Sequence, residues 1–196
     1  MSDFLRQAVE ERASLQQQLA ECQAELQNCQ ERSAGLEEQN SMLTTLYVAC
    51  QRLHSSLDRA EVLLALREII ANLVGCEEYA LVDLAPEGFR LEDSWGLETA
   101  DCLERPFVSA RIHEVIQRGE SFVAAEGDAQ ELTACIPLKR DGAVTGVLVL
   151  FRLLSHKGEL QELDRELFRL LESHLANVLY CLDLDESRRG ANGAAR

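Results

Sequence analysis

The chain has 196 residues, 46% of them apolar, which is enough for a packed core and excludes a wholly disordered protein. It carries 34 acidic against 19 basic residues, so its surface repels phosphate backbones, and we expect no nucleic-acid partner. No apolar run approaches the ~20 residues that cross a bilayer, and no secretion signal is visible, so we expect no membrane insertion. Seven cysteines without a C-x-x-C pair suit a reducing compartment, which predicts a cytoplasmic protein.

Residues 1–40 are predicted to form a coiled-coil dimerisation helix. Gly35 is the only glycine in this segment, proline is absent from it, and apolar residues recur at alternating spacings of three and four. A single helix of this length would extend far beyond a small domain, which favours pairing with a second chain. Asn40 at an a position favours a parallel homodimer. The predicted interface consists of Leu15, Leu19, Cys22, Leu26, Cys29, Leu36, Asn40 and Leu43.

Residues 41–184 are predicted to form a globular domain, and residues 185–196 a disordered tail. The heptads continue to Leu57 without an obvious break, which predicts one rod that joins the coil to the first helix of the domain. Asp58 is then placed to cap a helix that ends at Gly75.

The pattern after Gly75 predicts an α+β domain. Segments of alternating apolar residues are typical of strands, and Asp141-Gly142 between two of them is a strong hairpin signal. The predicted strands are 79–85, 89–95, 121–125, 132–140 and 143–153, and the predicted helices are 112–118 and 160–184. Strands joined mainly by hairpins, with helices at both ends, indicate an antiparallel sheet with flanking helices. Gly146, inside an otherwise apolar strand, predicts a bulge or a close approach of two backbones.

The order of these elements and three stretches of sequence resemble the GAF domain family over residues 41–184. LDRAEVLLALREIIANLVGCEEYALVDL is similar to the opening helix and first strand, ACIPLKRDGAVTGVLVLF to a strand pair, and LDRELFRLLESHLANVL to the closing helix. The resemblance implies an antiparallel sheet of about six strands with terminal helices on one face and a small-molecule pocket on the other. It also implies dimerisation through the terminal helices.

The candidate ligand-binding residues follow from this resemblance. They are Trp95, Phe107, Ile112, His113 and Cys135. We expect the first three to fill a core rather than to line a pocket, and we expect His113 to be structural. The apolar neighbours of Cys135 predict a core residue with a raised pKa. We expect His54 and His174 to be interface or surface residues, and we expect no metal and no cofactor.

The sequence therefore favours a non-enzymatic, homodimeric regulatory or adaptor protein that acts through an unidentified protein partner, with a small-molecule ligand left open. Two alternatives stand beside this hypothesis. The first is a purely structural coiled-coil scaffold with a vestigial pocket. The second is a cysteine-dependent redox enzyme of the methionine sulfoxide reductase type, with Cys102 and Cys135 as its candidate cysteines.

Overall fold

The computed structural model describes residues 2–85, 88–97, 103–124, 132–155, 157–158 and 160–194. The chain divides into two compact units, Met1–Thr45 and Leu46–Arg196, called here the N-terminal unit and the globular unit. The elements are α1 (Ser2–Leu53), α2 (Arg59–Ile69), the π-helix η1 (Ile70–Val74), β1 (Cys76–Ala85), β2 (Gly88–Trp95), α3 (Pro106–Arg118), β3 (Phe122–Val123), β4 (Ala134–Arg140), β5 (Ala143–Leu153) and α4 (Glu162–Ala194).

All described residues of the N-terminal unit are helical, because α1 begins at Ser2 and continues past the end of this unit. Side-chain amides donate to carboxylates one turn later, from Gln17 to Glu21 and from Gln27 to Glu31, both at 3.0 Å. All eight residues of the predicted dimer interface are exposed in the single chain. Within the part of the chain that the structure describes, no helix combines the length and apolarity needed to cross a membrane.

The expected single rod is interrupted between α1 and α2. Leu57 lies in the turn that joins the two helices, so the first long helix ends earlier, at Leu53. The cause is a new helix start at Asp58, whose carboxylate accepts from the backbone N–H groups of Ala60 at 2.8 Å and Glu61 at 3.2 Å. The predicted helix cap is therefore confirmed, and the rod prediction is wrong beyond Leu53.

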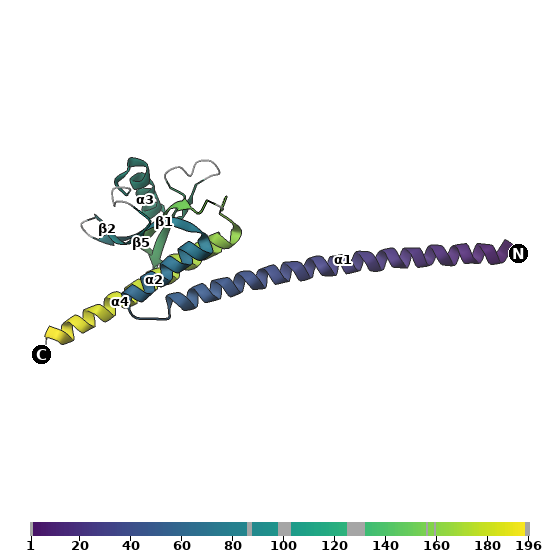
Figure 1. Ribbon diagram of the computed structural model, residues 1–196, viewed down its shortest axis with the longest axis horizontal. Helices are drawn as coiled ribbons and strands as arrows, with labels where there is room; N and C mark the ends of the chain where they lie inside the picture. Colours follow the sequence, from purple (N-terminus) through teal and green to yellow (C-terminus); the bar gives the residue numbers. More distant parts are fainter. Residues whose placement is uncertain are drawn as a thin grey trace. The chain divides into compact units, whose positions relative to one another are not determined.

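The globular unit contains an antiparallel sheet with the strand order β2-β1-β5-β4-β3. Figure 1 labels β1, β2 and β5 of this sheet. The described residues form five strands, as the alternating pattern predicts, rather than the six that the family resemblance implies. The β4–β5 hairpin turns at Asp141-Gly142, where both residues have left-handed backbones with φ of 52° and 81°. This turn confirms the strongest hairpin signal in the sequence.

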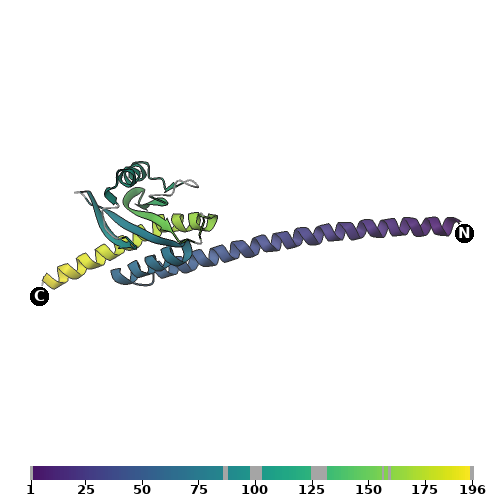
Figure 2. The ribbon, with the colours of Figure 1, turned by 45° about the horizontal axis from the view of Figure 1, so that its top comes forward.

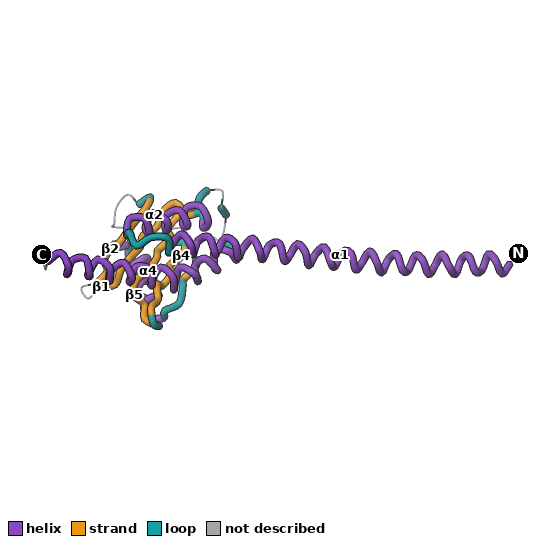
Figure 3. The backbone as a smooth tube through the Cα atoms, turned by 90° about the horizontal axis from the view of Figure 1, so that it is seen from below, coloured by secondary structure: helices purple, strands orange, loops and turns teal. Residues whose placement is uncertain are grey.

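Two apolar cores lie on opposite faces of the sheet. Figure 2 shows helices on both sides of the strands. The end of α1, together with α2, η1 and α4, packs on the face that carries Tyr79 and Leu81. Figure 3 shows α2 and α4 crossing this same face. Helix α3 packs on the other face, which carries Ala80 and Val82. The central strands are therefore apolar on both sides, which explains their nearly continuous apolar sequence.

Helix α4 continues to Ala194, so the tail expected from residue 185 onward is helical as far as the structure describes it. The segment keeps residues that favour helices, and Arg189 forms a 2.7 Å ion pair with Asp185, one turn before it. Gly190 and Gly193 lie after this pair, and the helix continues through both.

Candidate functional site

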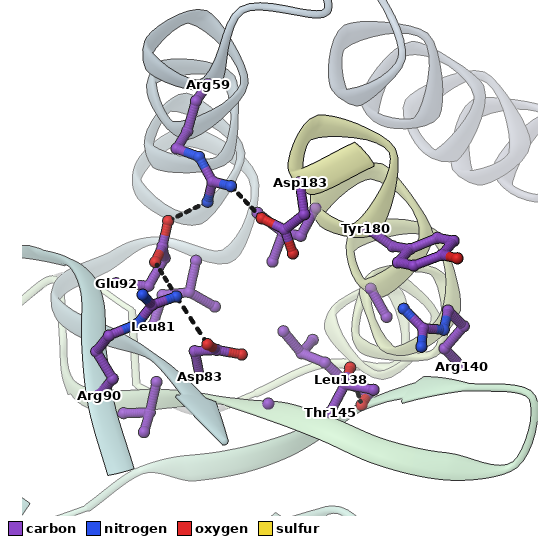
Figure 4. A pocket seen from close by; sticks show the side chains of 14 residues that line it. Arg59, Leu81, Asp83, Arg90, Glu92, Leu138, Arg140, Thr145, Tyr180 and Asp183 are labelled. Atoms are coloured by element: carbon purple, nitrogen blue, oxygen red, sulfur yellow. Dashed lines mark hydrogen bonds and ion pairs between the residues drawn. The ribbon is translucent and has the colours of Figure 1, made fainter. Parts of the chain in front are cut away.

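A cleft opens in the globular unit between α2, α4 and the sheet (Figure 4). Its floor is apolar and includes Leu81 and Leu138, whereas its rim is charged. The cleft is small, with about 50 Å³ open to water. A cleft of this volume can hold a small polar ligand but not a large cofactor. It also leaves room for α2 and α4 to move slightly relative to each other.

Arg59 dominates one end of this cleft. As the first residue of α2 it follows the capped turn, and only 24% of its side chain is exposed. Its guanidinium donates to Glu92 of β2 and to Asp183 and Glu186 of α4, with Nε lying 2.9 Å from the Glu186 carboxylate. Burial by itself would lower the pKa of Arg59, but the hydrogen bonds to these carboxylates outweigh it and raise the pKa. We call this four-residue cluster the Arg59 clasp; it joins α2, β2 and α4.

The remaining rim residues extend the same pattern of paired charges. Arg90 donates to Asp83 at 2.9 Å and lies 3.6 Å from Glu92, so the clasp continues onto the sheet. At the opposite end, the Arg140 guanidinium stacks 3.7 Å from the centroid of the Tyr180 ring on α4. Among the described residues that line the cleft there is no cysteine, histidine or serine. The paired charges tie α2, β2 and α4 together at this cleft.

Two of the sequence-predicted site residues are core residues. Ile112 and Cys135 are completely buried in the core beneath α3. Burial raises the pKa of Cys135 to about 12, so its thiol stays protonated at neutral pH. A buried, protonated thiol does not favour the redox-enzyme alternative, and Cys102 lies outside the described residues.

The other three predicted residues do not meet at one place. Trp95 is the cross-strand partner of Tyr79, and the guanidinium of Arg67 in α2 lies 4.6 Å from the centroid of its ring. Trp95 therefore lies on the face of the sheet that α2 covers. Phe107 is 41% exposed on α3. His113 is also exposed on α3, with its ring 4.9 Å from that of Phe89. The cleft described above contains none of the five.

The structure also brings together three residues that sequence reasoning did not combine. The Nε2 atom of His54 lies 3.0 Å from Nδ1 of His174, and the sulfur of Cys50 lies 3.6 Å from that same Nδ1. Burial and the neighbouring His174 lower the pKa of His54. The spacing of four residues between Cys50 and His54 places them on one helical face, a signal that the sequence does contain. The approach of His174 from α4 depends on the fold.

No family model matches the chain, and no curated protein is significantly similar to it. Solved structures do match. The GAF domain of a phosphoenolpyruvate-protein phosphotransferase from Acinetobacter is 18% identical, with a TM-score of 0.56, over 72% of this chain and 93% of that one. The GAF domain of a two-component sensor histidine kinase from Bacillus halodurans is 16% identical, with a TM-score of 0.51, over 67% and 99%. A GAF domain/HD domain protein from Geobacter sulfurreducens is 18% identical, with a TM-score of 0.50, over 68% and 99%.

These similarities extend over nearly the whole of each GAF structure and concern the arrangement of helices and strands more than the sequence. The globular unit of this chain has the fold of a GAF domain.

Proposed function

We propose that this chain is a non-enzymatic cytoplasmic regulatory protein, a parallel homodimer held together by α1. In this proposal the GAF-fold unit receives a signal and passes it to a protein partner. The observation that carries the proposal is a stripe of exposed leucines at heptad positions of α1. Their exposed fractions are 62% for Leu15, 59% for Leu19, 58% for Leu26, 61% for Leu36 and 63% for Leu43.

This stripe needs a helical partner to be buried. Complete burial of a leucine side chain stabilises a complex by roughly 1.5–3 kcal/mol. A second copy of α1, aligned in parallel, would place each leucine against its counterpart and would pair Asn40 with Asn40. Asn40, like Ser33, weakens the seam locally, so this stretch is where the coil would yield first.

Signal transfer is supported by the packing of the globular unit. Ala49 and Leu53, in the last turns of α1, are 1% and 0% exposed in the core shared with α2 and α4. The Arg59 clasp holds α2, β2 and α4 together at the cleft. A ligand or protein that opens the clasp would change the packing around the end of α1. The clasp and the end of α1 would then be coupled because the helices switch between two alternative packing arrangements.

The small volume of the cleft favours a second candidate. With only about 50 Å³ open to water, it suits a scaffold whose pocket is vestigial and whose coil carries the function. Binding of a small metabolite to the globular unit, measured by calorimetry, would distinguish a sensor from such a scaffold. We expect Arg59→Ala to weaken that binding if the cleft is the site.

The homodimer is tested by sedimentation of the full chain and of a Leu19→Glu/Leu26→Glu variant. We expect the native chain to sediment as a dimer and the variant as a monomer, because two charges are placed in the seam. A Leu64→Glu variant is the control, since Leu64 is 53% exposed but belongs to α2. A monomeric native chain would contradict the proposal.

Strand direction is tested by disulfide trapping. Cys22, Cys29 and Cys181 are exposed, so we use chains that retain only one of them. In a parallel, in-register coil, Cys22 faces Cys22 of the partner and cross-links under mild oxidation. Chains with Cys181 alone should cross-link far less. An antiparallel pairing would separate the two Cys22 residues and prevent the bond.

The role of the coil in signalling is tested in cells. Removal of residues 1–40 should give the phenotype of a complete gene deletion, if the coil carries the partner contact or the signal. Circular dichroism of the shortened chain checks that the globular unit is still folded. A wild-type phenotype would rule out the proposed role.

A further inference from the structure

We propose that Cys50, His54 and His174 form a binding site for a divalent transition metal, with Zn²⁺ as its natural occupant. The site joins the end of α1 to α4 inside the globular unit. It goes beyond the proposed regulatory function and does not depend on the homodimer. It also replaces the expectation that the two histidines are merely interface or surface residues.

The distances between the donor atoms fit one tetrahedral ion. Bonds of about 2.0 Å to nitrogen and about 2.3 Å to sulfur place two nitrogens roughly 3.3 Å apart, and nitrogen and sulfur roughly 3.5 Å apart. The observed separations are 3.0 Å between the two histidine nitrogens and 3.6 Å between Cys50 Sγ and His174 Nδ1. All three donor atoms lie within 4.8 Å of one another. Because His54 is exposed, a small rotation of its ring can complete the set.

The orientation of the rings supports the same interpretation. The rings of His54 and His174 are nearly perpendicular, at 83°, with centroids 5.3 Å apart, and Nε2 of His54 lies 3.0 Å from Nδ1 of His174. Without a metal, one of these nitrogens must carry a proton and donate it to the other. With a metal, both lone pairs bind the ion, and the adjacent Cys50 sulfur adds a third donor.

The donor set selects the metal. Thiolate with two imidazoles suits Zn²⁺, whereas Mg²⁺ and Ca²⁺ prefer oxygen ligands. On binding, the bond between the Cys50 sulfur and the metal replaces the S–H bond, and the proton goes to solvent. Three protein ligands leave the fourth tetrahedral position to water. Such a site exchanges its metal more readily than a four-cysteine site, which suits reversible occupancy.

The test uses the full-length chain, stripped of metal and titrated with Zn²⁺. We expect one Zn²⁺ per chain, and at least tenfold weaker binding after Cys50→Ser or His174→Gln. The matched controls are Cys181→Ser and His113→Gln, which remove an exposed cysteine on α4 and an exposed histidine on α3. Both controls should bind like the native chain. Co²⁺ is the spectroscopic probe, since a thiolate-to-cobalt charge-transfer absorption should appear in the native chain and disappear in Cys50→Ser.

A folding defect is separated from a binding defect by a third variant. His54→Gln alters an exposed side chain, so we expect its melting temperature without metal to be native-like while Zn²⁺ no longer raises it. The monomeric Leu19→Glu/Leu26→Glu chain should still bind one Zn²⁺, so failure of the dimer and failure of the site are distinguishable. A native chain that binds Zn²⁺ no better than His54→Gln would overturn the proposal and leave only a histidine–histidine hydrogen bond.

Discussion

Replacement of Gly146 by alanine probes the closest packing in the sheet. Gly146 lies in β5, opposite Asp83 of β1 and Leu138 of β4. A Cβ atom added there would lie 2.7 Å from the carbonyl oxygen of Val82, closer than real Cβ atoms approach backbone. Because β1 is paired on both sides, Val82 cannot move away without disturbing two rows of hydrogen bonds.

The expected loss follows from two opposing effects. Overpacking a well-packed core costs about 1–3 kcal/mol, and we expect the upper end because the contact is with backbone. Alanine also reduces the entropy of the unfolded chain, which offsets about 0.4–1 kcal/mol. The net destabilisation of Gly146→Ala is about 2 kcal/mol, which lowers the melting temperature of a unit of this size by roughly 4–8 °C. Gly146→Val should lose more.

Fluorescence of Trp95, the only tryptophan, reports unfolding of the globular unit separately from the N-terminal unit. Gly158→Ala is the matched control, because nothing lies within 4 Å of its added Cβ. We expect the control to stay within about 0.5 kcal/mol of the native chain. An unchanged transition for Gly146→Ala, or an equal loss in both variants, would refute the steric argument.

Three further predictions concern caps, buried charges and thiols. Asp58→Ala should lower the free energy of unfolding, measured by thermal denaturation, by about 1 kcal/mol, because it removes the N-cap of α2. Asp58→Asn should keep most of the native stability, because asparagine can also cap a helix. Lys157→Met should lower the free energy of unfolding by about 3–5 kcal/mol, because it leaves the buried, 1%-exposed carboxylate of Asp164 without the ammonium group that lies 2.6 Å away. A decrease below about 1 kcal/mol in urea unfolding would contradict this. Burial raises the pKa values of Cys76 to about 11 and of Cys135 to about 12, above the value of 9.0 for an unburied thiol, so the contribution of these two thiols to stability should be constant below pH 9 and should be lost as pH rises beyond it; replacing both by alanine should flatten that part of the profile.

Local signals in the sequence predicted most of the fold. Asp58 and Asp141-Gly142 act through hydrogen bonds and backbone angles among near neighbours, so their effects follow from the sequence itself. Gly146 was predictable for a related reason, since a glycine in an apolar strand leaves room for an adjacent backbone. The heptad pattern, by contrast, did not show that α1 ends at Leu53, because Leu57 still fits the repeat.

The candidate site was harder to predict because it depends on which face of the sheet each side chain occupies. The family resemblance suggested that Trp95 and Ile112 share a pocket, but the sheet separates them. The Arg59 clasp joins charged residues from three distant segments, each of which alone resembles a solvated surface group. Only the tertiary fold brings such charges together.

The alternation of β5 between the two cores has a consequence for how the domain tolerates change. Leu148 and Val149 are joined by a peptide bond, yet Leu148 packs with the helical layer and Val149 with α3. Substitutions at these adjacent positions share few neighbours, so their effects on stability should nearly add, as they do for distant sites. The two faces of the sheet can therefore diverge in sequence independently, each repacking without compensation from the other.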